Sequence, residues 1–349
     1  MAYCRVLNDE GDFMKFSKSE KKQLMIYVAI AFGVTYLMGI LMWYGHVAGK
    51  SLDLFPNAQM LYPAAGVIVL LMATRKREEM PRRFFLSYLV VTVLFIAVTA
   101  ASLFIEDKSG VLWLTVCQIL IIGGSVLCGI LLLIERNEKR IAYGLKGKNW
   151  KTSFVCIGVF ILLYILRMLV AYILDGDLKE LEKLGTFLAD PFTWIMFINI
   201  AINFFLSYLA FFGEEYGWRY YLQPMLQKRY GKRMGVIVLG IVWGLWHLPL
   251  DFFYYTSPDM GLAMTASQIV TCITLGIFFA YAYMKTENIW VPVILHFINN
   301  NLVALFSGGY SADSLENQVV TWGSVLAALV LDMATFGWFL LAKEFRKEN

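Results

Sequence analysis

The sequence predicts an all-α polytopic membrane protein with about ten transmembrane helices. Of its 349 residues, 59% are hydrophobic and only 16% are charged, whereas soluble domains carry about 25% charged residues. Several apolar runs approach the ~20 residues that are needed to cross a bilayer. Lys and Arg gather between alternate runs, as the positive-inside rule requires of cytoplasmic loops.

The predicted spans follow one another along the chain and alternate in direction. Hydropathy places them at 24–44, 60–74, 84–105, 111–134, 153–174, 197–222, 234–250, 262–284, 288–306 and 319–342. Basic residues precede the first span and follow every even-numbered span, while the loop 307–318 has none. This alternation predicts that both termini are cytoplasmic and that the loop 307–318 is external.

We expect four segments and no soluble domain. They are a cytoplasmic tail (1–23), N-terminal transmembrane helices without a readable motif (24–175), a core that carries the polar motifs (176–342) and a second cytoplasmic tail (343–349). Segment 175–196 mixes both charge signs and predicts an interfacial helix. The five cysteines show no CxxC spacing, and four lie in apolar runs, so they read as packing residues. Topology accounts for the basic residues, so nothing favours nucleic-acid binding.

Three ionisable residues lie deep inside predicted spans, where charge costs roughly 2.5–3.5 kcal/mol or more. They are Glu214, His247 and His296 on the sixth, seventh and ninth spans. Measured from the nearest cytoplasmic basic cluster at ~1.5 Å per residue, their depths are ~21, ~21 and ~16 Å. Three helices therefore bring one acid and two imidazoles to a common level. By contrast, Arg167 is expected to extend to the outer surface, and Asp332 to be structural.

Helical spacing separates the polar residues into faces. Glu214 and Glu215 are ~100° apart around a helix, so they point in different directions. Glu215 lies four residues before Arg219, the favourable spacing for an ion pair. Asn300 lies one turn after His296 and shares its face.

These residue types suffice for amide hydrolysis, which needs an activated water, oxyanion donors and an acid for the leaving amine. A buried glutamate suits general acid–base work, and an asparagine suits oxyanion stabilisation. Two histidines with a glutamate could also hold a catalytic zinc with one open position. The same residues have plainer interpretations, since an ion pair can pin helices together and a membrane histidine can bridge them.

Three stretches resemble the motifs of one family, the CAAX-processing and bacteriocin-immunity (CPBP, or Abi) intramembrane proteases. EEYGWRYYLQPML from Glu214 resembles the EExxxR motif, WGLWHLPL from Trp243 resembles FxxxH with a following Leu-Pro, and HFINNN from His296 resembles HxxxN. Order and spacing agree within residues 214–300. Trp243 departs from the pattern, which has phenylalanine there, and this puts the size of the pocket in question.

The resemblance implies a type II CAAX prenyl endopeptidase-like hydrolase with a conical catalytic cavity in its C-terminal half. Glu214 would be the general base, with Glu215 and Arg219 as its structural partners. His247 would position water, and His296 with Asn300 would bind metal or stabilise the oxyanion. Tentative metal ligands are His247, His296 and Glu214, for zinc. A metal-free mechanism fits the same residues equally well, so the metalloprotease label stays open.

The expected substrate is a peptide or lipidated protein in the membrane, of CAAX, bacteriocin-immunity or signal-peptide type. We expect an integral protein of a bacterial plasma membrane, and the sequence does not indicate its oligomeric state. Two alternatives use the same polar residues. One is a proton-coupled transporter, and the other is a non-catalytic membrane immunity protein.

Overall fold

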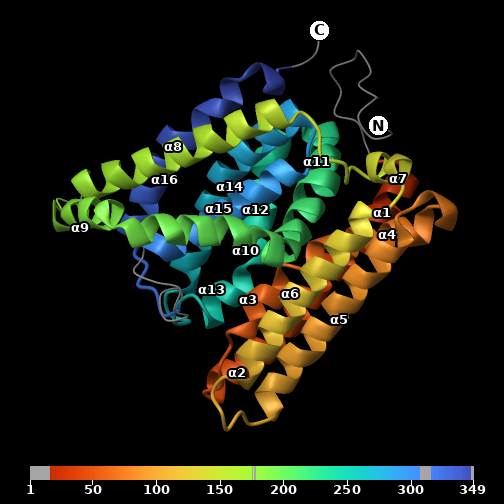
Figure 1. Ribbon diagram of the computed structural model, residues 1–349, viewed down its shortest axis with the longest axis horizontal. Coiled ribbons are helices and arrows are strands. Elements are labelled where there is room, and N and C mark those ends of the chain that lie inside the picture. Colours follow the sequence, from red (N-terminus) through yellow and green to blue (C-terminus); the bar gives the residue numbers. More distant parts are fainter. Residues whose placement is uncertain (1–15, 175, 177, 307–315, 347–349) are drawn as a thin grey trace.

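The computed structural model describes residues 16–174, 176, 178–306 and 316–346, and every regular element in these ranges is helical (Figure 1). Eight stretches within them are long and apolar enough to cross a membrane, which confirms the all-α polytopic prediction. They are Lys18–Val47, Leu54–Thr74, Arg82–Phe104, Leu112–Ile134, Trp150–Leu174, Pro191–Tyr230, Gly261–Thr286 and Trp322–Leu341. Most of the predicted external loop 307–318, namely residues 307–315, lies outside the described residues.

The predicted count of ten spans is not confirmed, because two of the predicted spans form shorter helices. They are α12 (Lys232–Trp246), with 15 residues, and α15 (Trp290–Phe306), with 17. At ~1.5 Å per residue these helices measure about 22 and 26 Å, less than the ~30 Å of a bilayer core. Pro249 ends α12 early, since proline removes a backbone donor and clashes with the preceding turn. His247 follows the last residue of α12, and His296 lies in α15.

An N-terminal region comprises the first seven α-helices. They are α1 (Lys18–Ala31), α2 (Gly33–Val47), α3 (Leu54–Gln59), α4 (Tyr62–Thr74), α5 (Arg82–Phe104), α6 (Leu112–Leu133) and α7 (Asn137–Ala142), with a short 3-10 turn, η1 (Arg77–Glu79). Within it α1 packs on α4 and α5 packs on α6. A capping box between Ser17 and Glu20 starts α1 at Lys18, several residues before the predicted span.

The C-terminal region contains the remaining helices. They are α8 (Trp150–Leu174), α9 (Leu178–Ala189), α10 (Pro191–Glu215), η2 (Tyr216–Leu222), α11 (Gln223–Tyr230), α12, α13 (Leu248–Phe253), α14 (Gly261–Thr286), α15, α16 (Trp322–Phe336) and two short 3-10 turns, η4 (Gly337–Leu341) and η5 (Lys343–Phe345). Helix α10 contacts α4 and α6 on one side and α15 on the other. It therefore joins the two regions (Figure 1).

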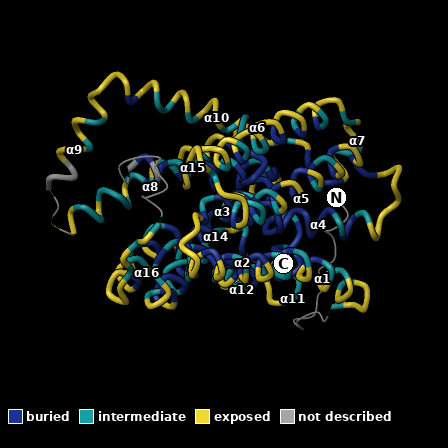
Figure 2. Tube along the Cα trace, turned by 90° about the horizontal axis from the view of Figure 1, so that it is seen from below, coloured by how far each residue is buried: buried dark blue, intermediate teal, exposed yellow. Residues whose placement is uncertain are grey.

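Helix α9 lies where the sequence predicts an interfacial helix, but it is shorter than predicted. Asp190 caps the next helix by accepting a hydrogen bond from the Phe192 amide at 2.9 Å, and Pro191 occupies its first turn. In Figure 2, α9 and the adjoining part of α10 are mostly exposed. Helix α10 thus begins at Pro191, before the predicted start at 197.

Glycines allow very close helix contacts in the described part of the chain. A Cβ on Gly213 would lie 2.3 Å from the Met60 carbonyl oxygen, and a Cβ on Gly217 would lie 2.3 Å from Pro63 Cβ. Small residues four apart let two membrane helices approach until their backbones touch. Gly213 and Gly217 therefore seat α10 and η2 against α3 and α4, on either side of the two glutamates.

Arg167 forms an ion pair that the sequence did not predict. Its Nη1 donates to Asp332 Oδ1 at 2.7 Å and so joins α8 to α16. The guanidinium also lies 5.1 Å from the centre of the Tyr164 ring. A buried carboxylate makes a better partner for arginine at this depth than a distant headgroup does, and this pairing agrees with a structural role for Asp332.

Candidate active site

The two glutamates stand at the point where α10 changes into a π-helix. Helix α10 ends at Glu215, and η2 continues with wider turns from Tyr216 to Leu222. Such π segments often mark functional sites, because they rotate side chains away from the ordinary α-helical positions. Glu214, Glu215 and Arg219 are 2%, 0% and 0% exposed, so all three need partners inside the protein.

Glu215 links Arg219 and His296 in one network of hydrogen bonds. Its Oε2 accepts a hydrogen bond from Arg219 Nε at 2.8 Å, and its Oε1 lies 2.9 Å from His296 Nδ1. The predicted ion pair with Arg219 is therefore present. It extends to α15 through His296, so the same carboxylate fixes both the arginine and the imidazole.

Arg219 also contacts aromatic rings. Its Nη1 and Nη2 have no hydrogen-bond partner within the described ranges. The guanidinium instead lies 4.8 Å from the centre of the Trp243 ring and 5.5 Å from that of Phe279. Ring faces attract a desolvated cation, which compensates in part for the missing hydrogen bonds.

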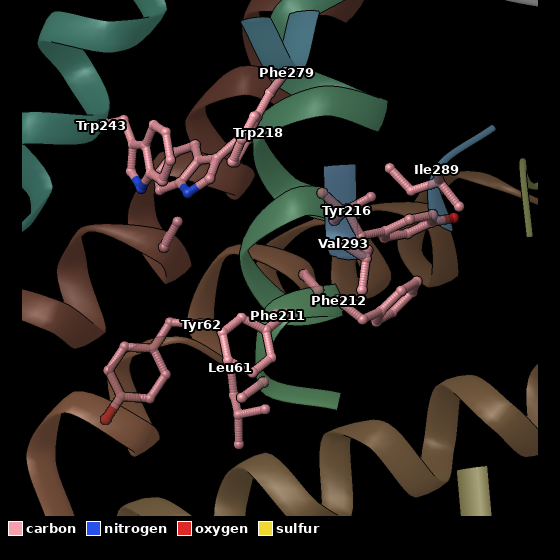
Figure 3. Close-up of a cluster of buried hydrophobic side chains, with 14 of the residues drawn as sticks. Leu61, Tyr62, Phe211, Phe212, Tyr216, Trp218, Trp243, Phe279, Ile289 and Val293 are labelled. Carbon is pink, nitrogen blue, oxygen red and sulfur yellow. The ribbon is translucent and has the colours of Figure 1, made fainter. Parts of the chain in front are cut away.

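Glu214 is held by one of its two oxygens. Oε2 accepts hydrogen bonds from Trp243 Nε1 at 2.7 Å and from Trp218 Nε1 at 3.3 Å. Figure 3 shows the two indole rings next to each other, with their nitrogen atoms on the same side. Oε1 has no hydrogen-bond partner in the described part of the chain. The carboxylate is thus oriented and keeps one oxygen available for a reacting molecule.

His247 lies at the end of α12, and its Nδ1 is 3.0 Å from the Trp243 carbonyl oxygen. A carbonyl can only accept, so the geometry assigns the proton to Nδ1 and leaves a lone pair on Nε2. The ring is 7% exposed. This tautomer can accept a proton or a hydrogen bond from a bound water.

Besides Arg219, Trp243 contacts three of the six predicted catalytic residues. Its indole donates to Glu214, its carbonyl accepts from His247, and its ring packs edge-to-face on His296 with centroids 5.6 Å apart. Phenylalanine, which the family pattern has here, would keep the ring contact but lose the N–H donor. The departure noted in the sequence therefore affects the hydrogen bonding of Glu214 as well as the size of the pocket.

The break between helices α12 and α13, at His247, is stabilised by side chains of the N-terminal region. Pro249 has no amide hydrogen for the Leu245 carbonyl, and this oxygen accepts instead from the Tyr36 hydroxyl at 3.1 Å. The Trp246 carbonyl accepts from Gln59 Nε2 at 3.0 Å. Two side chains that are distant in sequence thus satisfy the carbonyls around the break and fix the position of His247.

Asn300 is not joined to the other predicted residues by any hydrogen bond among the described residues. It is exposed, one turn after His296, and its Oδ1 accepts from Asn299 Nδ2 at 3.1 Å. Its role as an oxyanion donor stays a prediction.

Comparisons with known proteins agree with this constellation. The family model described as type II CAAX prenyl endopeptidase Rce1-like matches residues 192–302, which contain Glu214, His247 and His296. "CAAX prenyl protease 2" of Methanococcus maripaludis is 26% identical over 232 residues, which cover 63% of this chain and 82% of that protein. No solved structure matches.

Over residues 192–302 the chain is similar to the CAAX prenyl protease-like family. The matched segment lies inside the predicted core 176–342 and ends shortly after Asn300. Together with the eight apolar helices, this similarity supports an integral membrane protein and a membrane endopeptidase. The assignment of individual catalytic residues rests on the geometry described above.

The residues present do not fit a zinc site in this conformation. No group of three or more His, Cys, Asp or Glu side chains in the described ranges is placed to hold a metal ion, whereas catalytic zinc takes three protein ligands. Among the described residues, Nε2 of His247, Nε2 of His296 and Oε1 of Glu214 have no hydrogen-bond partner, but the three side chains do not form such a group.

Sequence reasoning missed several residues around the site. Trp218, Tyr36 and Gln59 gave no signal, because aromatic and single polar residues in apolar runs are common. Asp251 could have been found, since it is a carboxylate one turn after His247 in an apolar run. It is fully buried, and neither carboxylate oxygen has a hydrogen-bond partner within the described part.

The predicted conical cavity also stays a prediction. A cavity of ≈ 1030 Å³ lies beside the basic cluster that follows η2, where Tyr220, Gln223 and Gln227 line it. None of the six predicted catalytic residues lines this cavity.

Proposed function

We propose that this membrane endopeptidase cleaves a peptide bond of a membrane-associated protein with a water molecule that Glu214 activates. The single observation that supports this most strongly is the environment of Glu214. Two indole N–H groups hold its Oε2, and Oε1 is left without a partner among the described residues. A purely structural glutamate at 2% exposure would have both oxygens satisfied.

In the proposed reaction, Oε1 of Glu214 takes a proton from water while the water oxygen attacks the scissile carbonyl carbon. The carbonyl π bond breaks and its oxygen becomes an oxyanion. Glu214 then gives the proton to the leaving nitrogen as the C–N bond breaks, which yields an acid and an amine. The Nε2 lone pair of His247 accepts a hydrogen bond from the water and orients it.

Charge balance supports a protonated His296 as oxyanion donor. Glu214 and Glu215 carry two negative charges, and Arg219 carries one positive charge. An imidazolium at His296, facing Glu215 at 2.9 Å, brings the sum to zero. When Glu214 takes the proton, the cluster gains one positive charge as the oxyanion forms, so total charge in the low-dielectric site stays constant.

For the substrate we propose a CAAX-type lipidated protein or peptide. The support is the printed name of the relative, "CAAX prenyl protease 2", together with a site inside the apolar part of the protein. Zinc assistance through His247, His296 and Glu214 is the competing form of the proposal. It requires these side chains to converge further than they do here, and metal analysis of the purified protein tests it.

The test is cleavage of prenylated and unprenylated CAAX-type peptides by purified protein in proteoliposomes, with products identified by mass. We expect internal cleavage by the wild type and a loss of at least ~10²-fold in His247→Ala and His296→Ala. His46→Ala is the matched control, because His46 is the remaining histidine and is exposed at the end of α2. Equal activity in all three variants, or no cleavage by folded wild type, would overturn the proposal.

A further inference from the structure

A second polar site lies away from the active site, where α5 begins and α6 ends (Figure 1). It is a cavity of ≈ 510 Å³ between the turn η1, the first turns of α5, the end of α6 and α7. Arg77, Arg82, Arg83 and Lys139 line it together with apolar side chains. None of the predicted catalytic residues takes part.

The three arginines of this cavity carry uncompensated charge. Arg77, Arg82 and Arg83 are exposed, and their side chains make no hydrogen bond or ion pair within the described ranges. The one acid in the lining, Glu135, lies 3.9 Å from Lys139 Nζ. The cavity therefore has a surplus of three guanidinium groups, which match the oxygens of a phosphate in pairs.

The start of α5 adds to this positive potential. The helix begins at Arg82, and no side chain caps its first turn. The free amides of a helix N-terminus favour an anion, and here they lie beside two arginines of the same turn.

Below the charged groups, the lining is apolar and exposed. Leu86 and Ile134 line the cavity and are 40% and 65% exposed. The apolar surface continues one turn along each helix, with Val90 on α5 at 57% and Ile130 on α6 at 52%. A soluble anion would leave this surface uncovered, whereas an acyl chain attached to a phosphate would cover it.

We propose that this cavity binds the phosphate headgroup of an anionic phospholipid, with its acyl chains along Leu86, Val90 and Ile130. Three unpaired arginines favour a headgroup with net negative charge over a zwitterionic one, since a choline or ethanolamine cation would be repelled. Basic pockets between membrane helices bind such headgroups in other proteins. Helix α6 also supports α10, where the Tyr208 hydroxyl donates to the Ser125 carbonyl at 3.1 Å. The bound lipid would therefore stabilise the scaffold of the active site without entering it.

The experiment is native mass spectrometry of the full chain with phosphatidylglycerol or phosphatidylcholine of identical acyl chains. We expect the wild type to retain phosphatidylglycerol preferentially. The triple variant Arg77→Gln/Arg82→Gln/Arg83→Gln should lose about a hundredfold in affinity, since each basic residue at an anionic surface contributes roughly a factor of five. The control Lys18→Gln/Lys21→Gln/Lys22→Gln removes the same charge from exposed positions outside the cavity and should change the affinity less than threefold.

Several outcomes would overturn the proposal. They are equal retention of both lipids by the wild type, an equal loss in the lysine control, and displacement of the lipid by inorganic phosphate at the lipid's own concentration. If the triple variant does not fold, the single variants decide, each with an expected loss of about fivefold. Single variants that all bind like the wild type count against the site.

Discussion

The N-terminal helices α1–α6 and the helices α10–α15 of the proposed active site use their buried polar side chains in different ways. In the first group these side chains bond to backbone carbonyls, as Thr35 does to Ala31, Thr92 to Tyr88 and Tyr88 to Leu61. In the second group, some also bond to backbone carbonyls, but the charged side chains bond to one another, from Arg219 to Glu215 to His296. In the first pattern, side-chain donors are used in hydrogen bonds to the backbone. In the second pattern, charged groups lie close together, and Oε1 of Glu214 has no hydrogen-bond partner among the described residues.

This contrast does not make the N-terminal helices passive. Tyr36 and Gln59 donate hydrogen bonds to the backbone carbonyls that lose their helical partners at the break before α13. The Met60 carbonyl lies where any side chain on Gly213 would be placed. In the proposed mechanism, helices α10–α15 supply the reacting groups, and the N-terminal helices fix the position of these groups. A region without a motif can still determine the geometry of the site.

Gly213→Ala should have the largest effect of the substitutions that break this arrangement. The new Cβ would lie 2.3 Å from the Met60 carbonyl oxygen and 2.5 Å from the Tyr88 hydroxyl, and backbone cannot move aside cheaply. We expect a loss of about 3 kcal/mol or more of stability and at least ~10²-fold in cleavage rate. Thermal unfolding in detergent and the peptide assay measure the two effects.

Gly123→Ala is the matched control, because a Cβ on this α6 glycine meets nothing within 4 Å. It should leave both quantities unchanged. Wild-type activity in Gly213→Ala would show that the contact between α10 and the Met60–Tyr62 backbone does not position the site.

Trp243→Phe should have an intermediate effect within the catalytic helices. It keeps the ring against His296 and Arg219 but removes the N–H that donates to Glu214 at 2.7 Å. We expect kcat to fall roughly tenfold, as for loss of one charge-assisted hydrogen bond, with KM unchanged. If the indole has a purely structural role, Trp243→Phe would instead lower the stability of the protein without lowering kcat selectively relative to KM. Trp338→Phe, at an exposed ring, is the control.

The smallest effect is expected for Gln59→Met, which removes the donor to the Trp246 carbonyl but keeps the volume. Hydrogen bonds in membrane proteins contribute about 0.6–1 kcal/mol, so stability should fall by that amount and activity a few-fold. Gln118→Met on the exposed face of α6 should change neither. A loss as large as that of Gly213→Ala would mean that the break after His247 depends on this single bond.

Sequence alone predicted the helical class and, apart from Asn300, a set of polar residues that the structure brings together, for physical reasons. Charge at membrane depth is costly, so Glu214, His247 and His296 stood out, and spacing gave the Glu215–Arg219 pair correctly. What spacing could not give was the π-helix after Glu215, since the widening of the turns depends on tertiary packing around Gly217.

Long-range partners were equally hidden. Nothing local links Gln59 to the Trp246 carbonyl, or Arg167 to Asp332, because each pair joins helices that are distant in sequence. Two of the ten predicted spans, α12 and α15, are shorter than a membrane-crossing helix, and for α12 hydropathy does not register that Pro249 cuts the helix short. Polar residues whose burial in the membrane costs free energy were thus predictable. The residues that compensate for this cost through tertiary contacts were not.

The most direct measurement is the single-turnover cleavage rate of Glu214→Gln in proteoliposomes, together with its affinity for the same peptide. Glu182→Gln, at an exposed position of α9, is the control. Because the amide cannot take the proton of the attacking water, the rate should fall by ~10²–10⁴ while peptide affinity stays within threefold of the wild type. A Glu214→Gln protein that cleaves within tenfold of the wild-type rate would contradict the central role of this carboxylate.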